Sequence, residues 1–254
     1  HTDPAKRNVC FMGDACSRRM LPLSTGACSD VQLQFGVCDV SRGTTFPEKS
    51  ETGPLPAVPR QRGHAAIINK TCIGLEEFPD DLPGHLRRLY LPGNKLHELP
   101  ESAFRTLPQL VELDLNNNLI VTLPPLGALR CLRKLYLSNN RLTSLPPCLF
   151  KLAPDRPVLD LRELWCEHNC LEALPDDFRG ATRLLNLQCG WNRLRSMPLY
   201  LPPFLQQLLV QHNQLEAVPD AVGLQPHLVC LALRAQSPQT GFLELPKSLC
   251  KVQS

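Results

Sequence analysis

The chain has 254 residues, of which 43% are hydrophobic and 20% charged, and its formal net charge is +3. This is an ordinary globular composition, long enough for one large domain or two small ones. The weak charge argues against a nucleic acid partner, and no apolar run approaches the roughly 18 residues of a membrane span. The chain begins with His1 rather than Met, so we expect that it is processed, engineered or a fragment.

Residues 1–64 show no repeat and are predicted to be an irregular or disordered N-terminal segment. Residues 43–64 are rich in Pro, Gly and charge, which predicts a linker, although "PLPAVPR" also has the P-x-x-P form of a polyproline ligand. Residues 1–42 hold too few large apolar side chains for a core of their own. We expect them to be disordered, to pack loosely on the following domain, or to be held by disulfides if the chain is secreted.

One glycosylation triplet, Asn69-Lys70-Thr71, follows this segment. Such triplets arise often by chance, so this one alone is weak evidence for secretion. The four cysteines before it are spaced irregularly and form no C-x₂-C pair of a structural zinc site. They are Cys10, Cys16, Cys28 and Cys38.

From residue 86 onward one pattern recurs with constant internal spacing: L-x-x-L-x-L-x-x-N-x-L-x-x-L-P. Its six full units are residues 86–100, 110–124, 132–146, 161–175, 184–198 and 205–219. The spacing of three and then two fits neither a helix nor a simple strand. It predicts one short strand and a turn per unit, whose leucines are buried only when units stack.

The pattern resembles the leucine-rich repeat family over roughly residues 65–250. This resemblance implies an α/β-type solenoid, a horseshoe with a parallel β-sheet on its concave face. The proline that ends each unit lacks an N–H and fixes φ, so we expect mostly extended or 3₁₀ segments on the convex side. We assign residues 65–254 to this domain, with a degenerate unit at each end. The last unit keeps Leu231 and Leu233 but lacks the asparagine.

The asparagine of each unit lies where the chain leaves the strand and turns inward. A buried turn leaves backbone groups without partners, and a short amide side chain can satisfy them. We therefore predict an internal amide ladder with a structural role. Its members are Asn94, Asn118, Asn140, Asn169, Asn192 and Asn213.

Side chains alternate along a strand, so residues beside the core leucines should face solvent on the concave side. Four of the five Trp and Tyr residues fall in two such columns, and exposed aromatics often anchor interfaces. The alternative is that these rings pack on one another and stiffen the sheet. The predicted partner-binding residues are Tyr90, Asp114, Lys134, Tyr136, Trp165, Glu167, His168, Gln188, Trp191 and His212. A neighbouring column alternates in sign from Arg88 to Glu163, which predicts cross-strand ion pairs.

Cys166 and Cys189 take the third leucine position in consecutive units, so we expect buried free thiols rather than a disulfide. Extracellular members of the family usually carry clustered cysteines beside the first and last repeats. Here only Cys72 and Cys250 lie there, which favours a reducing compartment and a cytoplasmic location.

The chain shows no G-x-S-x-G, H-E-x-x-H or glycine-rich phosphate motif, so we expect no enzyme, cofactor or metal site. The prediction is a non-catalytic module that binds a protein or peptide on its concave face. The resemblance is to the short Ras-pathway type of leucine-rich repeat protein, an intracellular adaptor or signalling scaffold. Two alternatives remain: a fragment of a secreted or cell-surface receptor ectodomain, and self-association through the same face.

Overall fold

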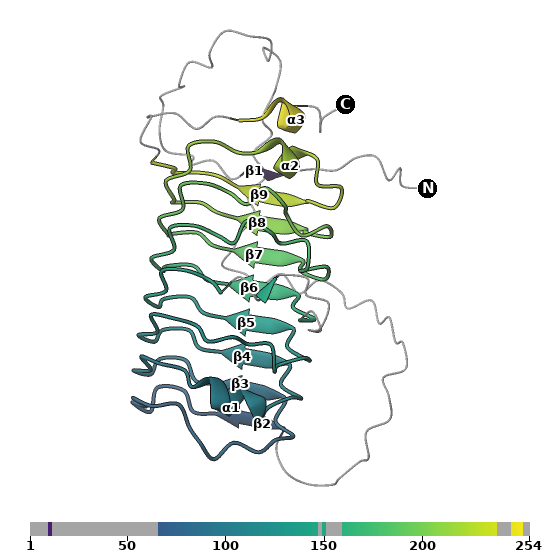
Figure 1. The fold of residues 1–254 in the computed structure, drawn as a ribbon. Coiled ribbons are helices and arrows are strands. Elements are labelled where there is room, and N and C mark those ends of the chain that lie inside the picture. The colour runs from purple at the N-terminus through teal and green to yellow at the C-terminus, as the bar shows by residue number, and fades with distance from the viewer. Residues whose placement is uncertain (1–9, 12–65, 147–148, 151–158, 238–244, 251–254) are drawn as a thin grey trace.

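The computed structural model describes residues 10–11, 66–146, 149–150, 159–237 and 245–250. The predicted N-terminal segment and linker, apart from two residues, therefore lie outside the described part of the chain. Within that part the chain forms a solenoid in which each repeat makes one turn and adds one strand to a single sheet (Figure 1).

The sheet has nine strands, and every neighbouring pair is parallel. The seven strands of the repeats are β3 (Arg88–Tyr90), β4 (Glu112–Asp114), β5 (Lys134–Tyr136), β6 (Glu163–Trp165), β7 (Asn186–Gln188), β8 (Gln207–Leu209) and β9 (Cys230–Ala232). The degenerate first unit supplies β2 (Ile67–Asn69) at one edge. At the other edge β1 (Cys10–Phe11), from the N-terminal segment, pairs with β9.

The strands pair without any shift in register. Leu113 of β4, Leu135 of β5 and Leu164 of β6 lie side by side, and all three are fully buried. Each column that the repeat defines in the sequence is therefore a real row of neighbouring side chains across the sheet. The leucine rows form one continuous core along the solenoid.

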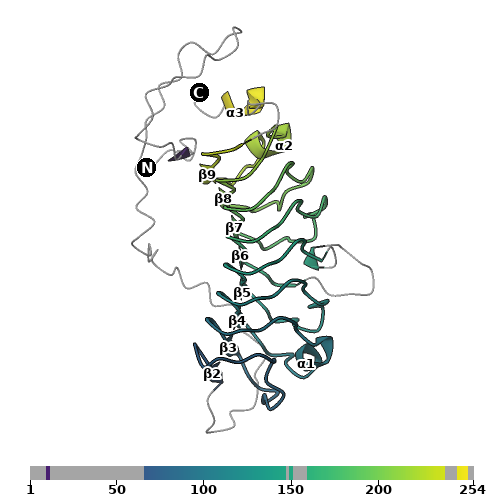
Figure 2. The same cartoon turned by 90° about the vertical axis from the view of Figure 1, so that its left-hand side faces the viewer.

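Among the described residues, the side opposite the sheet carries three short α-helices, α1 (Glu101–Arg105), α2 (Asp220–Gly223) and α3 (Lys247–Cys250), and is otherwise mostly extended or irregular. Pro100 and Pro219 precede α1 and α2 with φ of −71° and −68°. Figure 2 shows the strands along the hollowed side of the solenoid and these segments on the outer side. The predicted fold class is confirmed: a leucine-rich repeat type of horseshoe with its parallel sheet on the concave face.

The convex layer has its own aromatic packing, which the leucine pattern did not predict. The rings of Phe150 and Phe178 stack with centroids 4.2 Å apart, and Phe78 meets Phe104 edge to face at 5.4 Å. All four rings are buried. Phenylalanine thus fills the wider space behind the leucine rows in both halves of the solenoid.

The predicted amide ladder is present, and Asn140 shows its pattern. Its Nδ2 donates to the carbonyl of Leu137 at 3.0 Å and to that of Leu115, in the preceding repeat, at 2.9 Å. Its Oδ1 accepts the N–H of Ile120 at 3.1 Å, also in the preceding repeat. The side chain therefore fastens two coils together. All six asparagines are 3–8% exposed and bond in the same way.

The last unit lacks an asparagine, but the structure shows that the ladder does not stop there. Gln236 stands at the equivalent position and donates its Nε2 to the carbonyl of Val210 at 2.7 Å. Its Oε1 accepts the N–H of Leu215 at 3.2 Å. The repeat pattern did not predict a role for Gln236, because the pattern has asparagine rather than any side-chain amide at this position.

We predict that Asn140→Ala lowers the free energy of unfolding by about 2–3 kcal/mol. It leaves the buried Ile120 N–H without a partner, which costs roughly 1–3 kcal/mol. It also removes one of the two amide donors to each of the Leu115 and Leu137 carbonyls, which keep their bonds to Asn118 and Asn169. Urea unfolding followed by circular dichroism measures the loss. The matched control is Asn139→Gly, next in sequence but exposed and at φ +57°, which should change stability by less than about 1 kcal/mol. Equal losses in the two variants would contradict the ladder.

Candidate protein-binding face

The concave face is formed by the residues on either side of each strand's central leucine. In β5, for example, Leu135 is fully buried, whereas Lys134 and Tyr136 are half-buried and point away from the core. The same alternation places Tyr90, Asp114, Trp165 and Gln188 on this face, half-buried in each case. The strands thus bring these predicted residues into one row.

Two rings in this row pack on each other. The centroids of Tyr136 and Trp165 lie 4.9 Å apart, with an edge-to-face angle of 67°. The Tyr136 hydroxyl donates to Glu163 Oε2 at 3.2 Å. Burial, and then the negative charge of Glu163, raises the pKa of Tyr136 well above its ordinary value of 10.0, so the phenol remains a neutral donor. Lateral packing, the alternative reading of the aromatic columns, therefore operates for this pair.

Charged residues cross-link neighbouring strands, as the alternating column predicts. Lys134 Nζ lies 3.1 Å from Glu163 Oε1, and Arg88 Nε lies 3.5 Å from Glu112 Oε2. Such partly exposed pairs contribute at most about 1 kcal/mol each. Asp114, between them in the sheet, accepts the N–H of Asn116 at 2.9 Å, and burial raises the pKa of its carboxyl. The face is therefore mixed in charge and locally neutralised.

A second aromatic group lies at the turns that follow β6, β7 and β8. The ring of Trp191 is sandwiched between His168 and His212, with centroids 4.7 Å and 4.6 Å away and interplanar angles of 14° and 12°. We call these three residues the aromatic stack. His168 is exposed, and the other two are half-buried. The stack runs along the rim of the concave face and spans three repeats.

The backbone beneath the stack is in the left-handed region, with φ of 52°, 50° and 54° at His168, Trp191 and His212. This conformation is uncommon for bulky residues and costs of order 1–3 kcal/mol each. Earlier repeats place Gly93, or an asparagine, at the same point of the turn, also at positive φ. The pairs "GN" and "NN" in those repeats were the sequence signal for this turn, because Gly and Asn adopt it most readily.

A polar bridge supports the turns under the stack. Gln211 Nε2 donates to Glu167 Oε1 at 3.3 Å, across the intervening repeat. The bridge passes over Gly190, where an added Cβ would lie 2.7 Å from that nitrogen. Gly190 therefore has to lack a side chain for Glu167 and Gln211 to meet. Burial raises the pKa of the Glu167 carboxyl above its ordinary value of 4.5.

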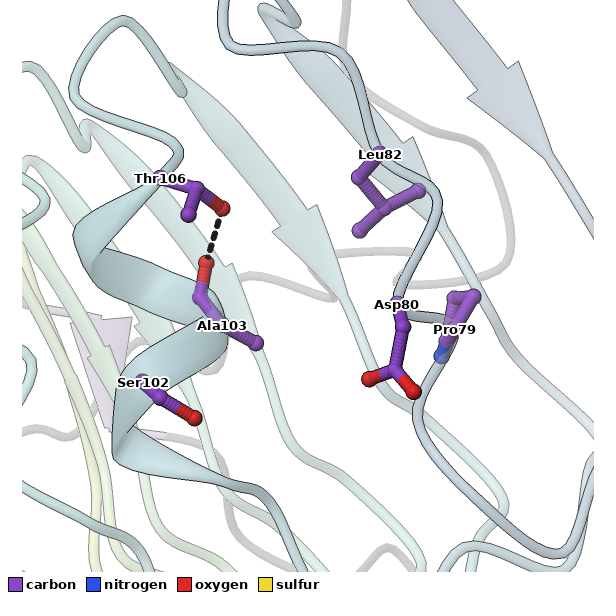
Figure 3. Close-up of a pocket in the computed structure, with 6 residues that line it drawn as sticks. All are labelled: Pro79, Asp80, Leu82, Ser102, Ala103 and Thr106. Carbon is purple, nitrogen blue, oxygen red and sulfur yellow. Dashed lines mark hydrogen bonds between the residues drawn. The ribbon is translucent and has the colours of Figure 1, made fainter.

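The described residues contain no group of three or more His, Cys, Asp or Glu side chains placed to hold a metal ion. A cavity of about 180 Å³ opens beside α1, on the outer side of the solenoid (Figure 3). It is lined by Pro79, Asp80, Leu82, Ser102, Ala103 and Thr106, none of which was a predicted site residue. The Thr106 hydroxyl is already bonded to the Ala103 carbonyl at 2.7 Å. Among the described residues no helix is long and apolar enough to cross a membrane.

Comparison with known proteins agrees with this architecture. Residues 84–142 match the family model described as Leucine rich repeat. Human podocan-like protein 1 is 30% identical over 201 residues, which cover 68% of this chain and 39% of that protein. Leucine-rich repeat-containing protein 3 from Rattus norvegicus is 41% identical over 64 residues, covering 24% of this chain and 25% of its own. The chain thus matches only about a quarter to two fifths of the length of these relatives.

Solved structures give the same result. A chain in the octameric complex of Latrophilin 3, Unc5D and FLRT2 (LRR) is 27% identical with a TM-score of 0.54, and the match covers 70% of this chain and 58% of that one. An internalin from Listeria monocytogenes, 21% identical with a TM-score of 0.51 over 66% of this chain and 46% of its own, shares the fold. Fold and repeats together define a solenoid of the protein-interaction class. The chain is a leucine-rich repeat protein.

We predict that Glu167→Gln raises the free energy of unfolding at neutral pH and flattens its pH dependence. A carboxyl whose pKa is raised by folding binds more protons in the folded chain, so stability falls as pH rises from 4.5 through the folded pKa. Glutamine removes this loss but keeps an oxygen that can accept the Gln211 bond. Urea unfolding midpoints of the wild type and the variant, measured from pH 4.5 to neutral pH, check this prediction. A fall with pH as steep as that of the wild type would contradict the assignment.

We also predict that Trp191→Asn changes the free energy of unfolding by no more than about 1 kcal/mol. The two ring contacts that it removes are worth roughly 0.5–1.5 kcal/mol each. Relief of the left-handed backbone offsets them, because asparagine occupies this conformation at Asn117 and Asn139. Thermal and urea unfolding measure the change. A loss of several kcal/mol would show that Trp191 is a core residue rather than a surface one.

Proposed function

We propose that the chain binds a folded protein or a peptide on its concave face, with the aromatic stack as the main contact. The observation that carries this proposal is the placement of His168, Trp191 and His212 in an unfavourable backbone conformation at an accessible rim. Residues held in sparsely populated conformations cluster at functional sites, where the surrounding structure supports them. Trp is also the side chain most enriched at the energetic centres of interfaces.

The other predicted contacts flank the stack. Tyr136 and Trp165 form a rigid pair in the middle of the sheet, and Lys134, Glu163 and Glu167 supply charge of both signs around it. A mixed and partly neutralised field of this kind orients a partner more than it adds affinity. Consistent with a protein partner, the solved neighbour with a TM-score of 0.54 belongs to a complex of several proteins.

The setting that we propose is secreted or cell-surface, the alternative that the sequence analysis left open. The support is that the related proteins are mostly extracellular or cell-surface leucine-rich repeat proteins. Podocan-like protein 1 and keratocan are among the relatives; mouse keratocan is 28% identical over 146 residues, covering 58% of this chain and 28% of its own. The cytoplasmic adaptor inferred from the cysteine pattern becomes the second candidate.

One observation favours that second candidate. The Sγ atoms of Cys166 and Cys189 lie 3.0 Å apart in the core, yet the two thiols are not joined. Burial raises the pKa of the Cys189 thiol, so little thiolate is available to attack a disulfide. Unjoined neighbouring thiols are typical of a reducing compartment.

Thiol counting separates the two settings. Protein isolated from its native source without reductant is denatured and labelled with an alkylating reagent. Six of the 12 cysteines are free thiols in the structure, so for a secreted or cell-surface protein we predict that the other six are protected as disulfides until reductant is added. Nearly complete labelling before reduction would overturn the extracellular setting and support the intracellular adaptor.

The binding face is tested with a variant that replaces all three rings of the stack: His168→Asn, Trp191→Asn and His212→Asn. Asparagine suits the left-handed turn, so the fold is retained while the surface is lost. We predict that partners captured by the wild type are bound more than roughly tenfold more weakly, as expected for a lost hot spot. The control is Tyr200→Ala, an exposed aromatic outside the strands and the aromatic stack, which should bind normally. Equal capture by all three proteins would sink the proposed site.

A further inference from the structure

The strand at the first edge of the sheet, β2, ends in the glycosylation triplet Asn69-Lys70-Thr71. As a sequence motif it carries little weight, but the structure adds three observations about its surroundings. Asn69 and Thr71 are both exposed, and β2 pairs on one side only, with β3. The position therefore has room for a bulky group on an N-linked side chain.

The local geometry leaves the reactive atom available. Asn69 Oδ1 accepts the backbone N–H of Thr71 at 3.0 Å and also accepts the Thr71 hydroxyl. These bonds form an Asx turn, which fixes the amide plane of Asn69 relative to the threonine. No hydrogen bond from Asn69 Nδ2, the atom to which a glycan attaches, to another described residue is present.

The register of the sheet shows which face the side chain occupies. Ile68 pairs with Leu89 and packs against the core, whereas Asn69 pairs with Tyr90. Because side chains alternate along a strand, Asn69 belongs to the row that continues through Tyr90 and Asp114 to Tyr136. It is thus the first member of the concave-face row, two strands before the β4–β5 pair.

We propose that Asn69 is an N-glycan acceptor and that its glycan covers the β2–β3 end of the concave face. This inference rests on the proposed secretory setting. Oligosaccharyl transfer joins Asn69 Nδ2 to the anomeric carbon of the first sugar. It breaks the bond from that carbon to a lipid-linked pyrophosphate, which leaves with the electron pair, and Nδ2 loses one proton.

The consequence for the proposed function is a division of the concave face. A glycan rooted beside Tyr90 excludes a protein partner from β2 and β3, so contacts are confined to the part of the face from β4 to the aromatic stack. The glycan also shields the open edge of β2, whose unpaired backbone groups could otherwise pair with another chain. Tyr90 is therefore assigned to the shielded end, although it was one of the predicted binding residues.

The test directs the full chain into the secretory pathway of cultured mammalian cells with a foreign leader. The secreted protein is treated with peptide N-glycosidase F, and its peptides are mapped by mass spectrometry. We expect a mobility shift and conversion of Asn69 to aspartate in the wild type and in Lys70→Gln, which keeps the triplet. Neither should occur in Asn69→Gln or in Thr71→Ala, which remove it by two different changes.

Secreted wild-type protein with an unmodified Asn69 would overturn the inference, whatever the native location of the chain. If Asn69 is modified here but bare in protein from its native source, the acceptor assignment stands and the secretory setting in "Proposed function" is wrong. The two failures are therefore distinguishable.

Hydroxyl-radical footprinting tests the division of the face. Secreted wild-type protein and Asn69→Gln are oxidised in parallel, and modification of Tyr90 and Trp191 is quantified. We expect modification of Tyr90 to rise roughly twofold when the glycan is absent, because a bulky surface group no longer covers it. Modification of Trp191 should be the same in both proteins. Equal modification of Tyr90 in the two proteins would show that the glycan points away from the concave face.

Discussion

The structure depends on one recurring interaction, the side-chain amide that joins each coil to the coil before it. A solenoid turns its chain inward once per repeat, and each inward turn buries backbone groups that no strand can satisfy. The asparagine side chain satisfies these buried backbone groups. Its Nδ2 donates to carbonyls of its own and of the preceding repeat, and its Oδ1 accepts an N–H from the preceding repeat. Leucine burial supplies most of the stabilisation, and the amides determine how the coils are spaced.

This constraint also explains where a binding surface can form. The residue that precedes each ladder asparagine has to adopt positive φ so that the asparagine side chain turns inward. The side chain of that preceding residue is then directed to the rim of the concave face. The first three full repeats fill that position with Gly93, Asn117 and Asn139. In three consecutive repeats it carries His168, Trp191 and His212, whose rings are held parallel by the spacing of the coils. A rigid aromatic surface thus arises from the repeat geometry without any helix or loop insertion.

Much of the fold could be predicted because stacking makes sequence columns into structural rows. The six asparagines and the buried leucines followed from the spacing, whereas the parallel sheet followed from the resemblance to the leucine-rich repeat family. Gln236 was not predicted as part of the ladder, because the repeat pattern has asparagine at this position. Its longer side chain nevertheless makes the same two kinds of hydrogen bond. The convex phenylalanine contacts were not predictable, since segments of different length bring Phe150 and Phe178 together. The columns placed Tyr136 and Trp165 on one face, but they could not show how far the two rings bury each other.

The most direct test of the central claim is native-state hydrogen exchange at the backbone amides that donate to the asparagine oxygens. Four of these backbone amides, in the central and later repeats, belong to Ile120, Leu142, Leu171 and Leu194, and none of the four lies in a strand. If the asparagine side chains hold the coils together, these four backbone N–H groups exchange as slowly as the backbone N–H groups within the central strands. Exchange as fast as that of exposed surface turns would show that leucine packing and the backbone hydrogen bonds of the sheet hold the coils together without the asparagines.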